Sequence, residues 1–429
     1  MAFLARVSQN IQYGQSMKRL SNLQAQLDKT QRHLSGNTRL LTPADDPVAA
    51  ARALDLKQGK SMNTQFASNR GNAEDALKMQ ESTLNSFGTG IQRIQTLLVA
   101  AGDGAYAEEQ LRVVADEIRA IRDEMVGYAN TRDAYGNYLF SGHQVGTEPF
   151  DMSVTGQVSY KGDDGQLMIQ VDAARYMPAT NSGKAVFMGI KGMTASTVQM
   201  TGSTTATVPT IHNLMVDVDI RDEALSGQFA YKVTFSDNTP DADYVVERAP
   251  VTYDAQGNPT IGAYLPHASG TYTSDDKNTL EIEDNGVRFS VSGPVSDGDT
   301  LEILPGRAVR TDVFAYINEA IDLLEDTNLQ SDGGSINLAL GLEALLGNMA
   351  TGLDQVLTAR GSTGTRLKEL DALKMGGMDK DLQYTESISD LEDLDYYKAI
   401  SDLYQQQLTL QAAQQTFMMT NGMSLFNMM

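Results

Sequence analysis

Hydrophobic positions recur at alternating steps of four and three residues at both ends of the chain. The first series is Tyr13, Met17, Leu20, Gln24, Leu27, Gln31 and Leu34, and the second is Tyr396, Ile400, Leu403, Gln407, Leu410, Gln414 and Phe417. Such spacing puts one stripe on a helix, as in the seam of a coiled coil. Glutamine in two slots of each seam weakens it. We therefore expect terminal coiled-coil helices over residues 1–38 and 385–429 that are disordered in the monomer and become ordered on pairing or assembly.

Two longer helical blocks lie inside these ends. Residues 47–130 carry leucine and isoleucine at helical spacing, with a break at Gly102–Gly104, and residues 308–375 carry a similar pattern. Glycine pairs of this kind end one helix and permit another to start. We expect residues 40–148 and 306–384 to form a helical core domain.

The middle of the chain has the alternation and turn residues of strands. Residues 158–171 predict two strands around the turn Gly162-Asp-Asp-Gly165, within a β-hairpin region over 149–185. Residues 280–291 predict a hairpin around Asn285-Gly286. Residues 186–305 are expected to form a β-rich outward insertion. The fold class is therefore α+β, in which long antiparallel or coiled-coil helices from both termini form a base and carry a β-rich insertion.

A short acidic stretch separates the first two helices. Ser35-Gly36-Asn37 supplies a helix stop, and Asp46-Pro47 supplies an N-cap followed by proline in the first helical position. Thr42-Pro43 is an alternative start four residues earlier. Pro43, Asp45, Asp46 and Pro47 are interpreted as a helix-start turn, because a reactive carboxylate pair needs a partner group that is not evident nearby.

Composition narrows the class of protein. The chain has 429 residues, of which 41% are hydrophobic, enough for a sizeable core. It has no run long enough for a membrane helix, and residues 1–20 lack the apolar segment of a secretory signal peptide. Cysteine is absent, which excludes disulfide scaffolds. A net charge of −22 argues against nucleic acid as a partner.

Charge differs between the two ends. Residues 1–60 carry a net charge of +5 and residues 381–429 a net charge of −6. The ends would attract each other if they lay side by side, although solvated helix faces explain the same charges.

Motifs for chemistry are lacking. The four histidines, His33, His143, His212 and His267, are scattered, and neither a metalloprotease, a hydrolase nor a phosphate-loop motif occurs. Glu281, Glu283, Asn285 and Gly286 match the first offsets of a calcium loop, but the required glutamate at its end is missing. We expect no catalytic, cofactor or metal residues, and no enzyme.

Seven segments of the chain carry recognisable motifs. They are residues 6–10, 34–50, 137–142, 160–165, 360–370, 388–400 and 425–429, and they include the elements PADDP, NYLFSG and YKGDDG. Together they resemble the flagellin-like hook-associated family of the bacterial flagellum. The ends resemble flagellin-type termini in general, whereas PADDP, NYLFSG and YKGDDG resemble the proteins at the hook–filament junction.

This resemblance implies a structural protein that forms the junction ring between hook and filament. It implies export through the flagellar type III apparatus, an extracellular position on the flagellum, and a chaperone that holds the C-terminal segment before export. The implied neighbours are copies of itself, another hook-associated protein and flagellin, with no nucleic acid or membrane. Assembly and chaperone contacts would involve Tyr13, Met17, Leu20, Leu27, Leu34, Ile400, Leu403, Leu410 and Phe417.

Two other functions fit parts of the sequence. A flagellin-type filament subunit would share the terminal helices. A secreted surface adhesin would use the β insertion for binding, with the helical ends as its anchor.

Overall fold

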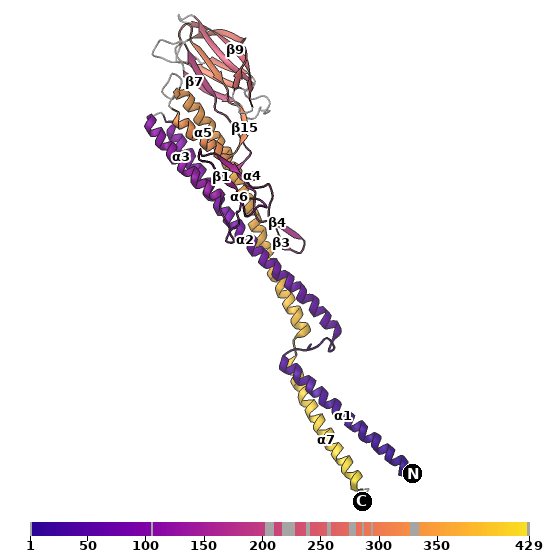
Figure 1. Ribbon diagram of the computed structural model, residues 1–429. Coiled ribbons are helices and arrows are strands. Elements are labelled where there is room, and N and C mark those ends of the chain that lie inside the picture. The colour runs from indigo at the N-terminus through magenta and orange to yellow at the C-terminus, as the bar shows by residue number, and fades with distance from the viewer. Residues whose placement is uncertain are drawn as a thin grey trace. The chain divides into compact units, whose positions relative to one another are not determined.

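A computed structural model describes residues 2–103, 106–201, 210–216, 228–236, 241–254, 259–273, 280–284, 287–292, 295–326 and 334–426 (Figure 1). The chain divides into two compact units. The first contains residues 1–70, 170–175 and 371–429, and the second contains residues 71–169 and 176–370. Within the described residues, no helix has the length and apolar character that crossing a membrane requires.

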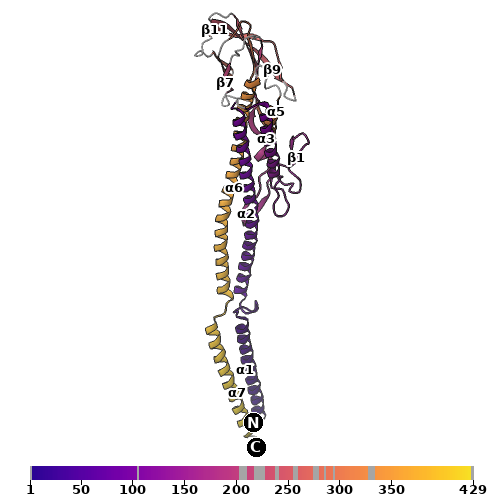
Figure 2. The same ribbon diagram turned by 90° about the vertical axis from the view of Figure 1, so that its left-hand side faces the viewer.

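The first unit consists of helices from both ends of the chain. Helices α1 (Ala2–Gly36) and α7 (Tyr396–Phe426) lie side by side, as both views show (Figures 1 and 2). The start of α2 (Pro47–Ala101) and the end of α6 (Gly334–Glu392) belong to the same unit. The expected stop of the first helix occurs at Gly36, where the next residue, Asn37, adopts a left-handed backbone with φ of 50°.

The second unit contains a helical core. Helices α3 (Glu108–Ala129) and α5 (Val313–Glu325) pack against each other and against the remaining parts of α2 and α6, and the short helix α4 (Gly183–Phe187) joins them. Phe187 is fully buried at the centre, with its ring 4.4 Å from Phe87 and 5.1 Å from Phe140. The expected break between α2 and α3 is present.

The β-rich insertion also lies in the second unit, which confirms the α+β class. A six-stranded sheet has the order β10-β9-β8-β14-β6, with β11 also pairing with β9, and a three-stranded sheet has the order β12-β13-β7. One apolar core, which includes Tyr231, Phe235 and Phe289, lies between them. The strands are β6 (Thr197–Thr201), β7 (Thr210–Val216), β8 (Phe229–Ser236), β9 (Asp241–Tyr253), β10 (Pro259–Ile261), β11 (Leu265–Thr273), β12 (Leu280–Asp284), β13 (Val287–Ser292) and β14 (Thr300–Leu304).

Strands β5 (Ile190–Met193) and β15 (Ala308–Thr311) pair at the two ends of this insertion. Val186, Phe187 and Ile190, which the sequence assigned to the insertion, are buried in the helical core. The Thr194 N–H donates to the Arg307 carbonyl oxygen at 3.0 Å. The chain therefore enters the insertion and returns from it at one place.

The predicted hairpin over residues 280–291 is present, since β12 and β13 pair antiparallel; its loop, Asn285-Gly286, lies outside the described residues. Glu281 and Glu283 of the calcium-loop alternative lie on β12 as ordinary strand residues.

The hairpin predicted around Gly162–Gly165 is wrong in its pairing. Both strands exist, but β2 (Val158–Tyr160) pairs with β1 (Phe150–Met152), and β3 (Met168–Asp172) pairs with β4 (Arg175–Pro178). The Asp163 carboxylate accepts hydrogen bonds from the His143 and Gly165 N–H groups, each at 2.8 Å. The Tyr160 hydroxyl donates to the Phe140 and Asp163 carbonyl oxygens, and its burial raises its pKa to about 12. These contacts fix the segment against residues 140–143, so it cannot close as a turn.

Candidate assembly interface

The terminal helices α1 and α7 form an antiparallel pair. The rings of Tyr13 and Phe417 lie 5.4 Å apart at one end, and the Tyr396 hydroxyl donates to the Leu34 carbonyl oxygen at 3.4 Å at the other. Each step toward the C-terminus along α1 is therefore matched by a step toward the N-terminus along α7. The two stripes found in the sequence consequently run in opposite directions along one interface, and the N- and C-terminal ends lie together (Figure 1).

On α1, the side that faces α7 differs from the predicted stripe at every second position. Leu20, Leu27 and Leu34 are half-buried, as expected, but Gln24 and Gln31 are exposed. The residues on the inner side between the leucines are Leu23 and Thr30. Steps of three and four also connect Leu20, Leu23 and Leu27, so the spacing in the sequence is equally consistent with Leu23 in the seam. The seam of α1 thus contains a leucine where a glutamine was expected.

On α7 the inner side includes Leu403, Leu410 and Phe417, with Ala399, Gln406 and Ala413 in the alternate slots, and Gln407 of the predicted stripe is half-buried as well. Gln406 keeps a side-chain oxygen buried without a hydrogen-bond partner among the described residues. A buried oxygen without a partner costs free energy, so the expectation that glutamine weakens the seam stays a prediction that now includes Gln406 beside Gln407.

Three of the residues proposed for assembly lie outside this seam. Tyr13 is 50% exposed, Met17 is 47% exposed and Ile400 is 39% exposed. They therefore lie at the edge of the pair, where a further helix could cover them.

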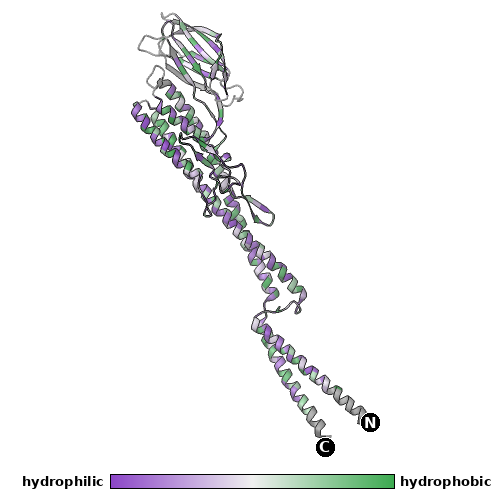
Figure 3. Cartoon of the chain, viewed as in Figure 1, coloured by the Kyte–Doolittle hydropathy of each residue, from purple (hydrophilic) through white to green (hydrophobic). Residues whose placement is uncertain are grey.

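The outer face of α7 is also apolar. Hydrophobic and hydrophilic residues alternate along both terminal helices (Figure 3). Five large apolar side chains on α7 are between 65% and 91% exposed: Tyr397, Tyr404, Leu408, Met418 and Met419. A soluble helix that has apolar residues on two faces needs partners on both. Within the described residues α1 supplies one of them.

The helix-start turn connects α1 to α2. Helix α2 begins at Pro47, and the Asp46 carboxylate accepts a hydrogen bond from the Ala49 N–H at 3.1 Å, which is N-cap geometry. This bond, and then Arg39, lower the pKa of Asp46. The alternative start at Thr42-Pro43 does not occur, and Pro43 lies within the turn.

Asp45 holds the turn against α1. Its carboxylate accepts from the Leu41 and Thr42 N–H groups, at 3.2 and 2.9 Å, and lies 2.7 Å from the Lys29 ammonium on α1. Lys29, followed by the Thr42 N–H, holds the pKa of Asp45 well below its usual range. The two aspartates therefore have separate roles, one within the cap and one between the turn and α1.

Contacts between the two ends of the chain continue beside the turn. The Arg39 N–H donates to the Glu392 carbonyl oxygen at 2.7 Å, and its guanidinium donates to the Leu391 carbonyl oxygen at 2.6 Å. Lys57 pairs with Glu392 at 2.6 Å, and Lys60 lies 4.0 Å from Asp381. Basic residues of the N-terminal end thus form ion pairs with acidic residues of the C-terminal end, between α2 and α6.

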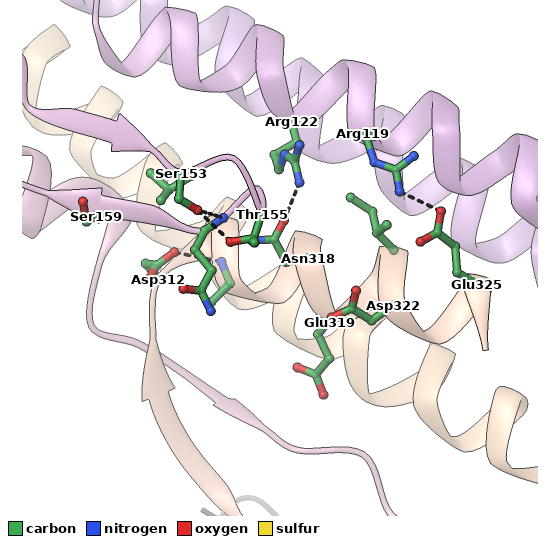
Figure 4. A pocket seen from close by; sticks show the side chains of 14 residues that line it. Arg119, Arg122, Ser153, Thr155, Ser159, Asp312, Asn318, Glu319, Asp322 and Glu325 are labelled. Carbon is green, nitrogen blue, oxygen red and sulfur yellow. Dashed lines mark hydrogen bonds and ion pairs between the residues drawn. The ribbon is translucent and has the colours of Figure 1, made fainter. Parts of the chain in front are cut away.

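A cleft of about 930 Å³ in the second unit is lined by charged and polar side chains (Figure 4). It lies between α3, α5 and the β1–β2 hairpin. Arg119 donates to Glu325 at 2.6 Å, which raises the pKa of Arg119, and Arg122 donates to Asn318 at 2.7 Å. Burial raises the pKa of Asp312, which caps α5 by accepting from the Ala315 N–H. These pairs join α3 to α5 and provide no nucleophile beside a base.

The described residues contain no group of three or more histidine, cysteine or acidic side chains placed to hold a metal ion. His33 bonds the Thr38 carbonyl oxygen, His143 lies 3.5 Å from Asp163 and His267 lies 3.6 Å from Asp284, while the side chain of His212 lies outside the described residues.

Comparison with known proteins finds similarity to proteins of the bacterial flagellum. Residues 7–145 match the family model of the bacterial flagellin N-terminal helical region. The chain is 25% identical to flagellar hook-associated protein 3 of Escherichia coli (strain K12) over 423 residues, which cover 99% of both chains.

A solved structure supports the fold. The flagellar junction protein FlgL from Legionella pneumophila, at 24% identity, superposes with a TM-score of 0.57 over 80% of this chain and all of that one. Flagellins match over less of the chain, such as the Salmonella enteritidis flagellin at 21% identity over 79% of this chain and 61% of its own length. The resemblance that the sequence motifs indicated is confirmed.

Proposed function

We propose that this chain, which resembles flagellar hook-associated protein 3 along its full length, is a structural subunit of the bacterial flagellum at the junction between hook and filament. The observation that carries the proposal is the match over 99% of both chains, β insertion included. A filament subunit is less well supported, because the flagellin matches leave part of each chain uncovered. An adhesin anchored by its ends does not account for a full-length match.

The terminal helices provide the assembly surface in this proposal. Half-buried Leu403, Leu410 and Phe417 face α1, while Tyr404 and Leu408 are exposed on the opposite side of α7. Each large apolar side chain that a neighbour fully buries contributes roughly 1.5–3 kcal/mol. Copies of the same chain in a ring, with another hook-associated protein and flagellin as the adjacent layers, would supply that burial.

The same apolar segment needs protection before assembly. A cytosolic export chaperone that covers α7 would keep the C-terminal segment unfolded and soluble until it passes through the type III apparatus. The subunit would then occupy an extracellular position at the junction, with the insertion facing outward. Its role is mechanical and not enzymatic.

Replacement of Leu403, Leu410 and Phe417 by serine tests whether assembly depends on the α1–α7 seam. Cells that carry the triple variant should build hooks but release flagellin into the medium as monomer. Thermal unfolding of the purified variant should match that of the unchanged chain, because the helical core does not contain these residues. A matched control replaces Gln405, Thr409 and Ala412, which are exposed on α7, by serine.

Cell fractionation separates the two roles of α7. Variant protein in the medium indicates failure of assembly, and variant protein retained in the cytosol indicates failure of chaperone docking. Normal filaments on the triple variant would rule out this face for both roles. Purified unchanged monomer should not polymerise without limit, and long filaments of it would favour the flagellin alternative.

Deletion of the insertion tests its independence. Residues 196–305 can be replaced by a short Gly/Ser bridge, because Thr194 and Arg307 are hydrogen-bonded neighbours and the β5–β15 pair is kept. Secretion and filament attachment should persist. Loss of motility with normal secretion would mean that the insertion takes part in the junction contacts.

A further inference from the structure

The tip of the β3–β4 hairpin, residues 170–175, crosses both long helices within the first unit. On the α2 side, the Asn69 amide donates to the Gln170 carbonyl oxygen and the Arg70 guanidinium donates to the Val171 carbonyl oxygen, at 2.8 and 2.9 Å. On the α6 side, Lys380 bonds both oxygens of the Asp172 carboxylate, at 3.2 and 3.1 Å. One short tip therefore holds α2 and α6 together.

Beneath the tip, α2 and α6 also approach each other directly. The Asn63 amide donates to the Gly377 carbonyl oxygen at 2.8 Å. A Cβ atom at position 377 would collide with the Arg70 guanidinium. Gly377 is therefore a notch in α6 that receives Arg70 and fixes the register of the two helices at this point.

Arg70 is poorly satisfied in this position. The residue is only 4% exposed, yet its Nε–H has no hydrogen-bond partner among the described residues. The Ala173 N–H, followed by Lys380 and then by the charge of Arg70, keeps the pKa of Asp172 below its usual range. Asp172 thus stays charged and attracts Arg70, but its oxygens bond Ala173 and Lys380 and leave the Arg70 Nε–H unpaired among the described residues. A buried guanidinium with an unpaired donor favours any state in which water reaches it.

We infer that residues 170–175 form a releasable latch, which covers Arg70 when closed and lets water reach its guanidinium when open. The Lys380–Asp172 pair and the two backbone acceptors close the latch, and the desolvation of Arg70 opposes them. Opening would free α6 from α2 at the Gly377 notch without unfolding the helical core. This inference concerns the single chain and is independent of the proposed function.

A thiol at position 171 reports the opening, because the chain has no cysteine and Val171 is fully buried. Val171→Cys should react with a thiol reagent about a hundredfold faster than Ala115→Cys, a fully buried position in α3 that opens only with the core. Lys380→Met in the Val171→Cys background should speed the reaction several-fold, whereas Lys368→Met, an exposed lysine elsewhere on α6, should leave it unchanged.

Arg70→Met in the same background gives the decisive result. Arg70→Met removes the bond to the Val171 carbonyl oxygen, which favours closure, together with the buried guanidinium and its unpaired Nε–H, which oppose closure. If the second effect outweighs the first, methionine of similar length should slow the labelling of the thiol at position 171 about tenfold. Faster labelling in Arg70→Met would show that Arg70 ties the tip down, and equal rates for the Val171 and Ala115 reporters would show that no latch opens; either result overturns the inference. Amide exchange over residues 168–175 of the unchanged chain provides the same measurement if the reporter variant fails to fold.

Discussion

The helical core of the second unit and the terminal pair α1–α7 are both built from leucine-rich helices, yet they bury very different amounts of apolar surface. In the core, α2, α3, α5 and α6 surround fully buried phenylalanines such as Phe87, Phe187 and Phe314. In the terminal pair, the seam leucines are only half-buried and Tyr13 and Ile400 are exposed. Two helices can cover only one face of each other, whereas four helices enclose a volume. The core can therefore be stable in a single chain, while the terminal pair needs neighbours.

The largest difference should appear in amide exchange of the purified monomer. Residues 1–38 and 385–429 should exchange about ten-thousandfold faster than the buried segments of α2 and α3, because terminal helices open locally and core helices only with the unit. Early proteolytic cleavage at both ends should accompany this. Slow exchange throughout both segments in a verified monomer would contradict the comparison.

A matched pair of phenylalanine substitutions should show the next largest effect. Phe187→Ala should destabilise the second unit by about 3–5 kcal/mol. The Phe187 ring contacts four other phenylalanines, and its removal leaves a cavity. Phe417→Ala loses one ring contact in a half-buried place, so denaturant unfolding of the core should not change. Similar unfolding curves for the two variants would remove the distinction between the regions.

The position of the seam can be tested on assembled flagella. Leu23→Gln should lower the temperature at which the subunit dissociates, through a loss of about 1 kcal/mol of partial burial. Gln24→Leu should not have the opposite effect, since Gln24 is exposed in the α1–α7 pair. A strong gain of stability in Gln24→Leu would show that the assembled ring uses the stripe first inferred from the sequence.

The smallest effect should concern the pH dependence of the helix-start turn. The pKa of Asp45 is lowered in the folded turn, so its contribution is present above the unfolded value near pH 4 and is lost as the pH falls toward the folded pKa. Amide protection of residues 41 and 42 should therefore decrease below about pH 4. Asp45→Asn should remove this dependence, and Asp55→Asn on α2 should retain it.

The sequence by itself determined that both ends of the chain are helical, where α1 ends and α2 begins, and the β character of the middle region. It did not determine the bounds of α5 and α6, since the block expected over 308–375 is two helices and α6 continues to Glu392. Gly36-Asn37 and Asp46-Pro47 act within a few residues of the backbone they terminate, so their effect is local and readable. The hairpin of β12 and β13 is equally local. Motifs at both ends and near residues 160–165 also indicated the resemblance that the full-length match confirms.

Only the tertiary structure decided which partners these elements take. The two leucine series allowed Gln24 or Leu23 in the seam, because both spacings fit a helix, and the antiparallel register with α7 selected Leu23. The strands around Gly162–Gly165 pair with other strands, because Asp163 bonds residues twenty positions away. The contacts of Arg70 with Val171 and Gly377 join three distant segments of chain. A periodic pattern specifies the face that a helix buries, but the choice of partner depends on packing between residues that the sequence places far apart.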